Sequence, residues 1–144
     1  MKTVRDILKQ KGLGLCSVRP DSTVYDALKL MAEKNIGAVL VLDGERPVGI
    51  LSERDYARQV ILKGKTSKDT PVREIMTSKV VFVRPEQSIE ECMALMTDKR
   101  IRHLPVLEES KLIGVVSIGD IVKAVISEKE FLIAQLENYI ASGG

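Results

Sequence analysis

Hydrophobic residues recur at helical spacing in two separate stretches of the chain. Thr23-x-x-Asp26 precedes the first stretch and Ser88-x-x-Glu91 precedes the second. A Ser or Thr followed three residues later by an acidic residue is typical of a helix N-terminus, because both side chains satisfy backbone N–H groups there. The pattern predicts two amphipathic helices, whose apolar faces contain Val24, Ala27, Leu28 and Met31 in one half and Ile89, Cys92, Met93 and Met96 in the other.

Continuous apolar runs follow both helices, as is typical of strands that are buried on both faces. A short polar segment and a second apolar run come next in each half, which predicts two hairpins. Another helix is then expected in each half, and in the first it stops near Gly64. The predicted strands cover 38–42, 48–51, 104–107 and 112–116, the turns cover 43–45 and 108–110, and the helices cover 56–62 and 121–126.

We expect a final helix to start at Ser127, because Ser127-x-x-Glu130 is another capping pattern. Its apolar residues are too many for a helix that lies free on the surface; they are Phe131, Leu132, Ala134, Leu136, Tyr139 and Ile140. This helix is therefore expected to dock on the chain's own core or on a second subunit.

The chain contains an internal repeat. A shift of 65 residues aligns residues 18–55 with residues 83–120 without a gap, and 12 of these 38 positions are identical. Upstream, residues 4–8 are similar to residues 72–76 at a slightly different offset. Each half thus reads strand, helix, strand, strand, helix. Neither half has enough sheet to bury its apolar faces alone, so two such halves would share one core.

These patterns predict an α/β (α+β) fold with two βαββα repeats, related by a pseudo-two-fold axis and with their sheets packed together, plus a C-terminal helix. We expect the first repeat at residues 1–64 and the second at 65–126, with a polar linker at 63–69. Residues 127–144 form the C-terminal helix and tail.

The two return strands end in the same pattern, Gly-x-x-Ser-x-x-Asp, at residues 49–55 and 114–120. A strand-to-helix turn presents free backbone N–H groups and the positive end of the helix dipole, which suits phosphate. The carboxylates of Asp55 and Asp120 suit a ribose diol, since they accept two hydrogen bonds and donate none. The same residues also form a helix-capping pattern. Capping, ligand binding or both therefore remain open at this stage.

Composition excludes several other functions. The net charge of +2 and the 3% of aromatic residues do not favour nucleic acid as a partner. With two cysteines and one histidine, a zinc site is not expected, and Cys92 is expected to be a reduced core thiol. There is neither a long apolar run nor a signal-peptide pattern, so we expect a cytoplasmic protein without a membrane partner.

The duplicated motif, together with Ile-Arg-His-Leu-Pro-Val at residues 101–106, resembles a tandem pair of cystathionine-β-synthase (CBS) domains, the Bateman module. The resemblance extends from about Val4 to Ile126 and is to the stand-alone bacterial type. It implies clefts between the repeats that bind AMP, ADP, ATP, S-adenosylmethionine or NAD. It also implies a homodimer that regulates a partner protein.

The resemblance assigns a role to each motif residue. Asp55 and Asp120 would bind ribose, while Ser52, Arg54, Ser117, Arg102 and His103 would lie near phosphate. Gly37 and Ala38 stand where the second half has Arg102 and His103, so the two sites should not bind equally. The expected pocket lining is Cys16, Val18, Ile36, Gly37, Ala38, Thr77, Val81, Ile101, Leu104 and Pro105. Whether Arg102 and His103 serve their own cleft or the facing one is left open.

Three functions are compatible with these residues. The first is a sensor that binds an adenine nucleotide, with AMP as the first candidate and no metal required, and signals to an unidentified partner without chemistry. The second is a homodimerisation module with vestigial pockets. The third, an enzyme, is disfavoured because the sequence has no Walker-type loop and no cluster of nucleophile, base or metal ligands.

Overall fold

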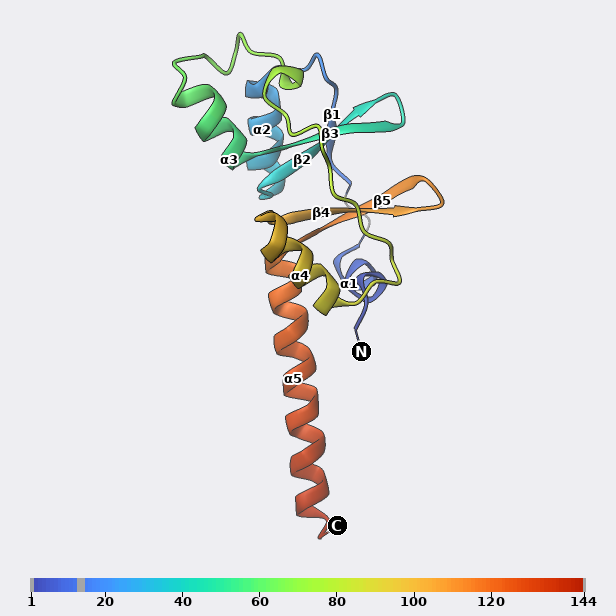
Figure 1. The fold of residues 1–144 in the computed structure, drawn as a ribbon. Helices are drawn as coiled ribbons and strands as arrows, with labels where there is room; N and C mark the ends of the chain where they lie inside the picture. The colour runs from blue at the N-terminus through green and yellow to red at the C-terminus, as the bar shows by residue number, and fades with distance from the viewer. Residues whose placement is uncertain (1, 13–14, 144) are drawn as a thin grey trace. The chain divides into compact units, whose positions relative to one another are not determined.

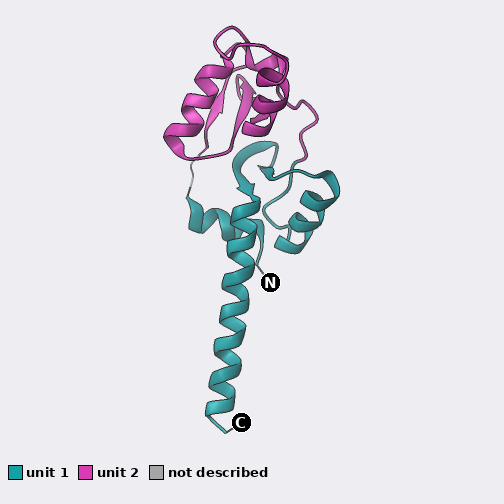
Figure 2. Cartoon of the chain, turned by 90° about the vertical axis from the view of Figure 1, so that its left-hand side faces the viewer, with its two compact units in different colours: residues 1–14, 82–144 teal, residues 15–81 magenta. Residues whose placement is uncertain are grey.

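A computed structural model describes residues 2–12 and 15–143, and these form a mixed α/β fold with two small sheets, as predicted (Figure 1). The described part of the chain divides into two compact units (Figure 2). Unit 1 contains residues 1–14 and 82–144, and unit 2 contains residues 15–81. The N-terminal segment therefore belongs with the second sequence repeat.

Unit 2 is built on a three-stranded sheet in the order β1-β2-β3. Strand β1 (Ser17–Val18) is parallel to β2 (Ala38–Asp43), which is antiparallel to β3 (Arg46–Ser52). Helix α2 (Val24–Lys34) follows β1, and α3 (Glu53–Tyr56) follows β3, with a π-helical segment (Ala57–Ile61) after it and a 3-10 helix (Val72–Glu74) further along. The core contains Val24, Ala27, Met31, Val39, Val41, Leu51, Val60, Val72 and Ile75.

Unit 1 repeats this arrangement with less sheet. Helix α4 (Ile89–Lys99) precedes the hairpin of β4 (His103–Glu108) and β5 (Lys111–Ser117), and Val83 makes an isolated parallel bridge to Val106 where the other unit has a first strand. Helix α1 (Val4–Lys11) packs on β5 and α5. Its Arg5 forms ion pairs with Glu86 and Glu108. Buried residues of the unit include Val4, Ile7, Val83, Ile89, Cys92, Met96, Leu104, Val106, Val116, Ile121 and Ala124.

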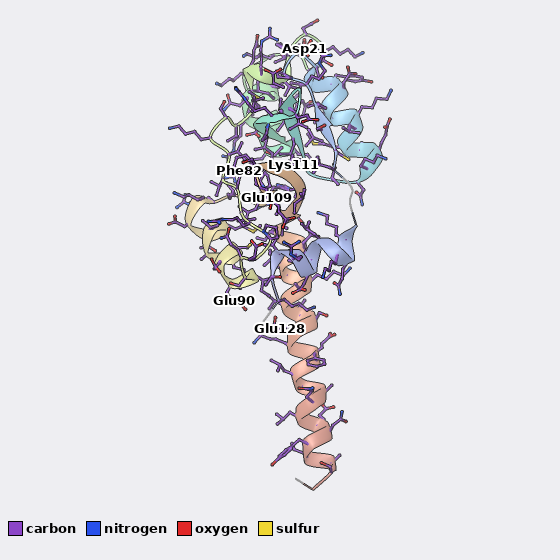
Figure 3. All side chains as sticks on the ribbon, turned by 90° about the vertical axis from the view of Figure 1, so that its right-hand side faces the viewer. Asp21, Phe82, Glu90, Glu109, Lys111 and Glu128 are labelled. Atoms are coloured by element: carbon purple, nitrogen blue, oxygen red, sulfur yellow. The ribbon has the colours of Figure 1, made fainter. Side chains whose placement is uncertain are left out.

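Both hairpins form where two apolar runs separated by a short polar segment predict them. In the second hairpin, Glu109 and Ser110 both have positive φ angles, of 51° and 67°. Positive φ at both central residues is typical of the two-residue turn that matches the twist of antiparallel strands. Figure 3 labels Glu109 and Lys111 at this turn.

The helices after β3 and β5 begin earlier than predicted. They start at Glu53 and Ile118, because Ser52 and Ser117 are themselves the N-caps. The predicted helix start at Ser127 is wrong, since α5 (Ile118–Ala141) is one continuous helix of 24 residues. Ser127 would need an extended backbone to act as a cap, whereas keeping a Ser inside a helix costs only a few tenths of a kcal/mol, roughly, relative to Ala.

Of the two alternatives left open for the last helix, docking on the chain's own core does not occur among the described residues. Every residue from Lys129 to Gly143 is exposed, and Phe131 and Leu136 each have 61% of their surface accessible. The alternative of a second subunit remains. No helix among the described residues combines the length and the apolar content needed to cross a membrane.

Candidate functional site

Both Ser/Asp turns are complete capping boxes. The hydroxyl of Ser52 accepts from the Asp55 backbone N–H at 3.1 Å, and the Ser52 N–H donates to Asp55 Oδ2 at 2.9 Å. Ser117 and Asp120 repeat this geometry at 3.2 and 2.9 Å. The capping role is therefore real in both units, and each carboxylate is held in a fixed, half-buried position at the helix start.

The expected row of free N–H groups at these helix starts is not what the structure has. The Glu53 N–H donates to the Gly37 carbonyl at 3.1 Å, and the Ile118 N–H donates to the Arg102 carbonyl at 2.9 Å. With the Asp N–H bonded to its cap, two of the first three amide donors of each helix are engaged. The helix dipole remains, but phosphate recognition would depend more on side chains than the sequence suggested.

The same bonds settle where Arg102 and His103 lie. The Arg102 carbonyl is tied to the first residue of α5, and His103 is the register partner of Ser117 across the β4–β5 ladder. Both residues therefore lie at the strand–helix turn of their own unit. In unit 2, Gly37 and Ala38 occupy this place, and Ala38 is the partner of Ser52. The predicted difference in charge between the two turns is thus a feature of the fold.

A further residue meets each motif aspartate. In unit 2 it is Thr77, predicted as pocket lining, whose hydroxyl lies 3.4 Å from Asp55 Oδ1 and whose N–H donates to the Ile50 carbonyl at 2.9 Å. In unit 1 the Lys11 ammonium makes both equivalent contacts, at 2.8 Å to Asp120 Oδ2 and 2.8 Å to the carbonyl of Val115. The Lys11 ammonium thus makes the two contacts in unit 1 that the hydroxyl and the backbone N–H of Thr77 make in unit 2.

Lys11 was missed from the sequence. The upstream similarity between residues 4–8 and 72–76 was the available signal, because it places the residues after Leu8 beside the second motif as Thr77 lies beside the first. The offset differs, and a Lys at the end of a helix looks like an ordinary solvated charge that complements the helix dipole.

The Lys11 ammonium affects the ionisation of Asp120. Burial tends to raise the pKa of Asp120, but the hydrogen bonds from Lys11 and from the Ser117 backbone outweigh it and hold the pKa below its ordinary value. The carboxylate is therefore ionised at neutral pH. A diol would have to compete with, or displace, the Lys11 ammonium to reach Oδ2.

The motif glycines have a packing role rather than a role in the turn. Gly49 and Gly114 lie inside β3 and β5, three residues before the cap. A Cβ on Gly114 would lie 2.7 Å from Leu8 Cδ2, and one on Gly49 would lie 2.6 Å from Met76 Sδ. Because glycine has no side chain, Leu8 can pack directly on β5 at Gly114, and Met76 can pack directly on β3 at Gly49.

Two cavities lie in unit 2. One, of about 250 Å³, is lined by Ile36 and Gly37 together with Leu28, Met31, Ala32, Asn35 and Glu53. The other, of about 580 Å³, is lined by Val18 and by Ser17, Arg19, Pro20, Asp21, Leu42, Asp43, Gly44 and Arg73. Asp55 lines neither of these two. The described cavities therefore contain three predicted lining residues but not the carboxylate of the motif.

The remaining predicted residues are spread over the strands beside these turns. Leu104 is fully buried in the core of unit 1, and Pro105 is buried next to it. Arg54 is exposed on the first turn of α3. Half-buried positions are taken by Cys16, Val81 and Ile101. The fold thus brings the Ser, Asp and strand-start residues together in each unit, while these others lie around them.

Cys92 is a free cysteine buried in the core of unit 1, which confirms the predicted burial. Burial, with a smaller contribution from the Glu91 charge, raises the pKa of its thiol to about 11. Within residues 2–12 and 15–143, no three His, Cys, Asp or Glu side chains are grouped closely enough to bind a metal ion.

Comparison with known proteins gives consistent matches. A family model for the CBS domain matches residues 4–61 and 72–127. The mitochondrial CBS domain-containing protein CBSX3 of Arabidopsis thaliana is 43% identical over 152 residues, which span 98% of this chain and 73% of that protein. A solved protein with CBS domains from Burkholderia ambifaria is 57% identical with a TM-score of 0.85, over 88% of this chain and 95% of its own.

A more distant structural match carries a ligand. It is a CBS domain protein from Pyrobaculum aerophilum complexed with AMP, with a TM-score of 0.74 over 83% of this chain and 89% of its own. At 24% identity, it shows similarity of fold alone.

Proposed function

This chain belongs to the CBS domain family, and from that membership we propose that it is a regulatory module that binds an adenine nucleotide without changing it. AMP is the first candidate, and ATP, NAD and S-adenosylmethionine are the alternatives. The observation that carries the proposal is the pair of half-buried carboxylates at equivalent strand–helix turns, Asp55 and Asp120. A partner protein would respond to the bound state, since a ligand that binds one arrangement better shifts the population toward it.

In this proposal Asp120 accepts hydrogen bonds from the ribose hydroxyls, and Ser117, Arg102 and His103 lie near the phosphate. Asp55, Ser52 and Arg54 would have the same roles in the other unit. The contacts that tie Arg102 and His103 to the turn of their own unit support this grouping. The AMP bound to the Pyrobaculum protein supports the choice of ligand class.

The two sites should discriminate differently between ligands. Arg102 and His103 add positive or potentially positive donors at one turn, where the other has Gly37 and Ala38. Charge-assisted hydrogen bonds to phosphate are roughly twice as strong as neutral ones. The Asp120 site is therefore proposed to prefer phosphorylated ligands over adenosine more strongly than the Asp55 site.

Calorimetry with AMP, ATP, NAD and S-adenosylmethionine tests the proposal. A ligand of about 23 heavy atoms at roughly 0.3 kcal/mol per atom binds with a Kd near 10 μM. Asp120→Asn keeps an acceptor for the Ser117 N–H but removes the ionised carboxylate, so it should weaken binding at that site. Asp98→Ala, a change at an exposed acidic residue of α4, is the matched control. No heat and no thermal shift with any of the four ligands would contradict the proposal.

A second candidate is an assembly module whose pockets no longer bind ligand. It is favoured by the internal partners of both motif aspartates, since Thr77 and Lys11 already meet these carboxylates. In a chain of this kind, the unsubstituted protein and the Asp120→Asn variant should assemble identically, with or without nucleotide. A sensor should respond to nucleotide when unsubstituted and should lose that response in the Asp120→Asn variant.

A further inference from the structure

The second half of α5 lies outside the packed part of unit 1. Ile121 and Ala124 are buried against the unit, and α1 and α4 contact the helix. Glu128 is the last half-buried residue, and its carboxylate accepts from the Lys2 backbone N–H at 3.4 Å. Figure 3 labels Glu128, beyond which the side chains of α5 have no other element of the unit beside them, and Figure 2 agrees.

This free portion of the helix has an apolar stripe along one side. Positions 122, 126, 129, 133, 136 and 140 alternate steps of four and three residues, which is the spacing of a coiled-coil seam. All are apolar except Lys129, and Leu132 and Tyr139 flank the seam. We define the C-terminal stripe as Val122, Ile126, Leu132, Ile133, Leu136, Tyr139 and Ile140, which are between 50% and 67% exposed.

We propose that the C-terminal stripe is a dimer interface in which α5 pairs antiparallel with α5 of a second copy of this chain. The proposal goes beyond nucleotide binding and does not depend on it. Ile and Leu at the seam positions interlock when two such helices supercoil. The same stripe on both copies makes a self-complementary contact that closes on itself.

The area of the stripe is sufficient for a stable pair. Seven half-exposed side chains would remove roughly 500–700 Å² of surface per chain, or about 1,000–1,400 Å² for a pair. Specific interfaces start near 1,000 Å². A patch of this size is also at the upper limit of what a soluble monomer exposes.

Lys129 determines the orientation. In a parallel pair it would face its own copy in the same layer of an apolar seam, with two like charges in contact. In an antiparallel pair centred near Ile133, Lys129 lies level with Glu137 of the second copy, because 129 and 137 are equally distant from residue 133. The two-fold axis then forms this attractive contact twice.

Charge also argues against a lipid surface as the occupant. Besides Lys129, the free part of α5 carries Glu130 and Glu137, with Glu128 just before it. Helices that lie on membranes usually have Lys and Arg on their polar face, since the lipid surface is often anionic. The acidic flank suits a second copy with an opposed Lys129 better.

Sedimentation of the full chain between 1 and 100 μM, roughly the range in which such interfaces associate, tests the interface. We expect a species of twice the 15.9 kDa chain mass. Ile133→Glu with Leu136→Glu should shift the dissociation constant at least 100-fold, while the thermal unfolding of the packed units stays unchanged. Phe131→Glu is the matched control, because Phe131 is as exposed as Leu136, at 61%, but lies off the stripe.

A spin label at Ser142→Cys in a Cys16→Ser background tests the orientation, with Cys92 buried and unlabelled. Antiparallel pairing about Ile133 separates the two labels by about 27 Å or more at 1.5 Å per residue, whereas parallel pairing brings them within about 10–15 Å. A short distance would overturn the proposal. So would a monomer at all concentrations, dissociation by Phe131→Glu alone, or binding of a monomeric chain to neutral phosphatidylcholine vesicles.

Discussion

Replacing Lys11 with Met tests whether one ammonium does in unit 1 what Thr77 does in unit 2. Met keeps most of the apolar stem but removes two hydrogen bonds of 2.8 Å, to Asp120 Oδ2 and to the carbonyl of Val115. Nothing in the substitution restores either contact. We therefore expect a loss of stability that is confined to unit 1.

The magnitude follows from the exposure of the pair. The Lys11 and Asp120 side chains are 38% and 23% exposed, so the ion pair itself should contribute about 0.2–1 kcal/mol after screening by solvent. The bond to the Val115 carbonyl should add about 1 kcal/mol. A total of about 1–2 kcal/mol corresponds to a fall in Tm of roughly 3–8 °C for a chain of this length.

Thermal and urea unfolding measure this loss, with Lys9→Met as the control on an exposed residue of the same helix. The double variant Lys11→Met with Asp120→Asn should lose about 0.5–1 kcal/mol less than the sum of the single variants, because both remove the same contact. Strict additivity, or equal Tm values for the Lys11 and Lys9 variants, would refute the shared role of the ammonium.

Other predictions concern acid, packing and the thiol. The pKa of Asp120 is lower in the folded chain than its ordinary value of 3.8, so its contribution to stability is complete above about pH 5 and is lost as pH falls through the folded pKa. Acid titration should therefore show the Lys11→Met cost falling to the share of the Val115 bond once Asp120 is protonated, and a constant cost would contradict this. Gly114→Ala should lower the free energy of unfolding by about 1–3 kcal/mol through the contact with Leu8, whereas Gly119→Ala, whose nearest neighbour would be 3.6 Å away, should be neutral or stabilise by up to about 1 kcal/mol in urea unfolding. With its thiol pKa near 11, Cys92 should react with a disulfide reagent at pH 8 only as the chain unfolds, and Cys16→Ser protein isolates that reaction.

The repeat made most of the fold predictable. Hydrophobic spacing located α2, α4 and both hairpins because each buries one continuous apolar face. Their ends were predictable because capping and turn residues lie next to them in the sequence. The start at Ser127 failed because a capping pattern is only a local preference, and a run such as Ile121 to Ile126 continues its helix unless the backbone is forced to extend. The surface on which that helix docks could not be predicted either, because no local sequence pattern indicates which surface covers an apolar stripe.

The two capping boxes were predictable from the sequence, but the other partners of their carboxylates were not. The spacing of Ser52 and Asp55, and of Ser117 and Asp120, fixed both capping boxes, because cap and carboxylate are three residues apart. The partners of these carboxylates come from elsewhere in the chain. Lys11 lies 109 residues before Asp120, and no local pattern pairs them. The packing role of the motif glycines was not predicted either, since their close neighbours Leu8 and Met76 are distant in sequence.

The position of Asp120 links the proposed ligand site to the proposed interface. Asp120 is the third residue of α5, the helix that carries the C-terminal stripe, and Lys11 ties the same carboxylate to the end of α1. A diol that displaces the Lys11 ammonium would release α1 from the first turn of α5 without touching the stripe. Since α5 is one continuous helix, a reorientation of its first turn would move the distant end with it. Nucleotide should therefore leave the Ser142–Ser142 distance, which the stripe sets, unchanged, but should change the distance between labels at Lys9→Cys on α1 and Ser142→Cys on α5 of the same chain. Lys11→Met should produce part of that change without nucleotide.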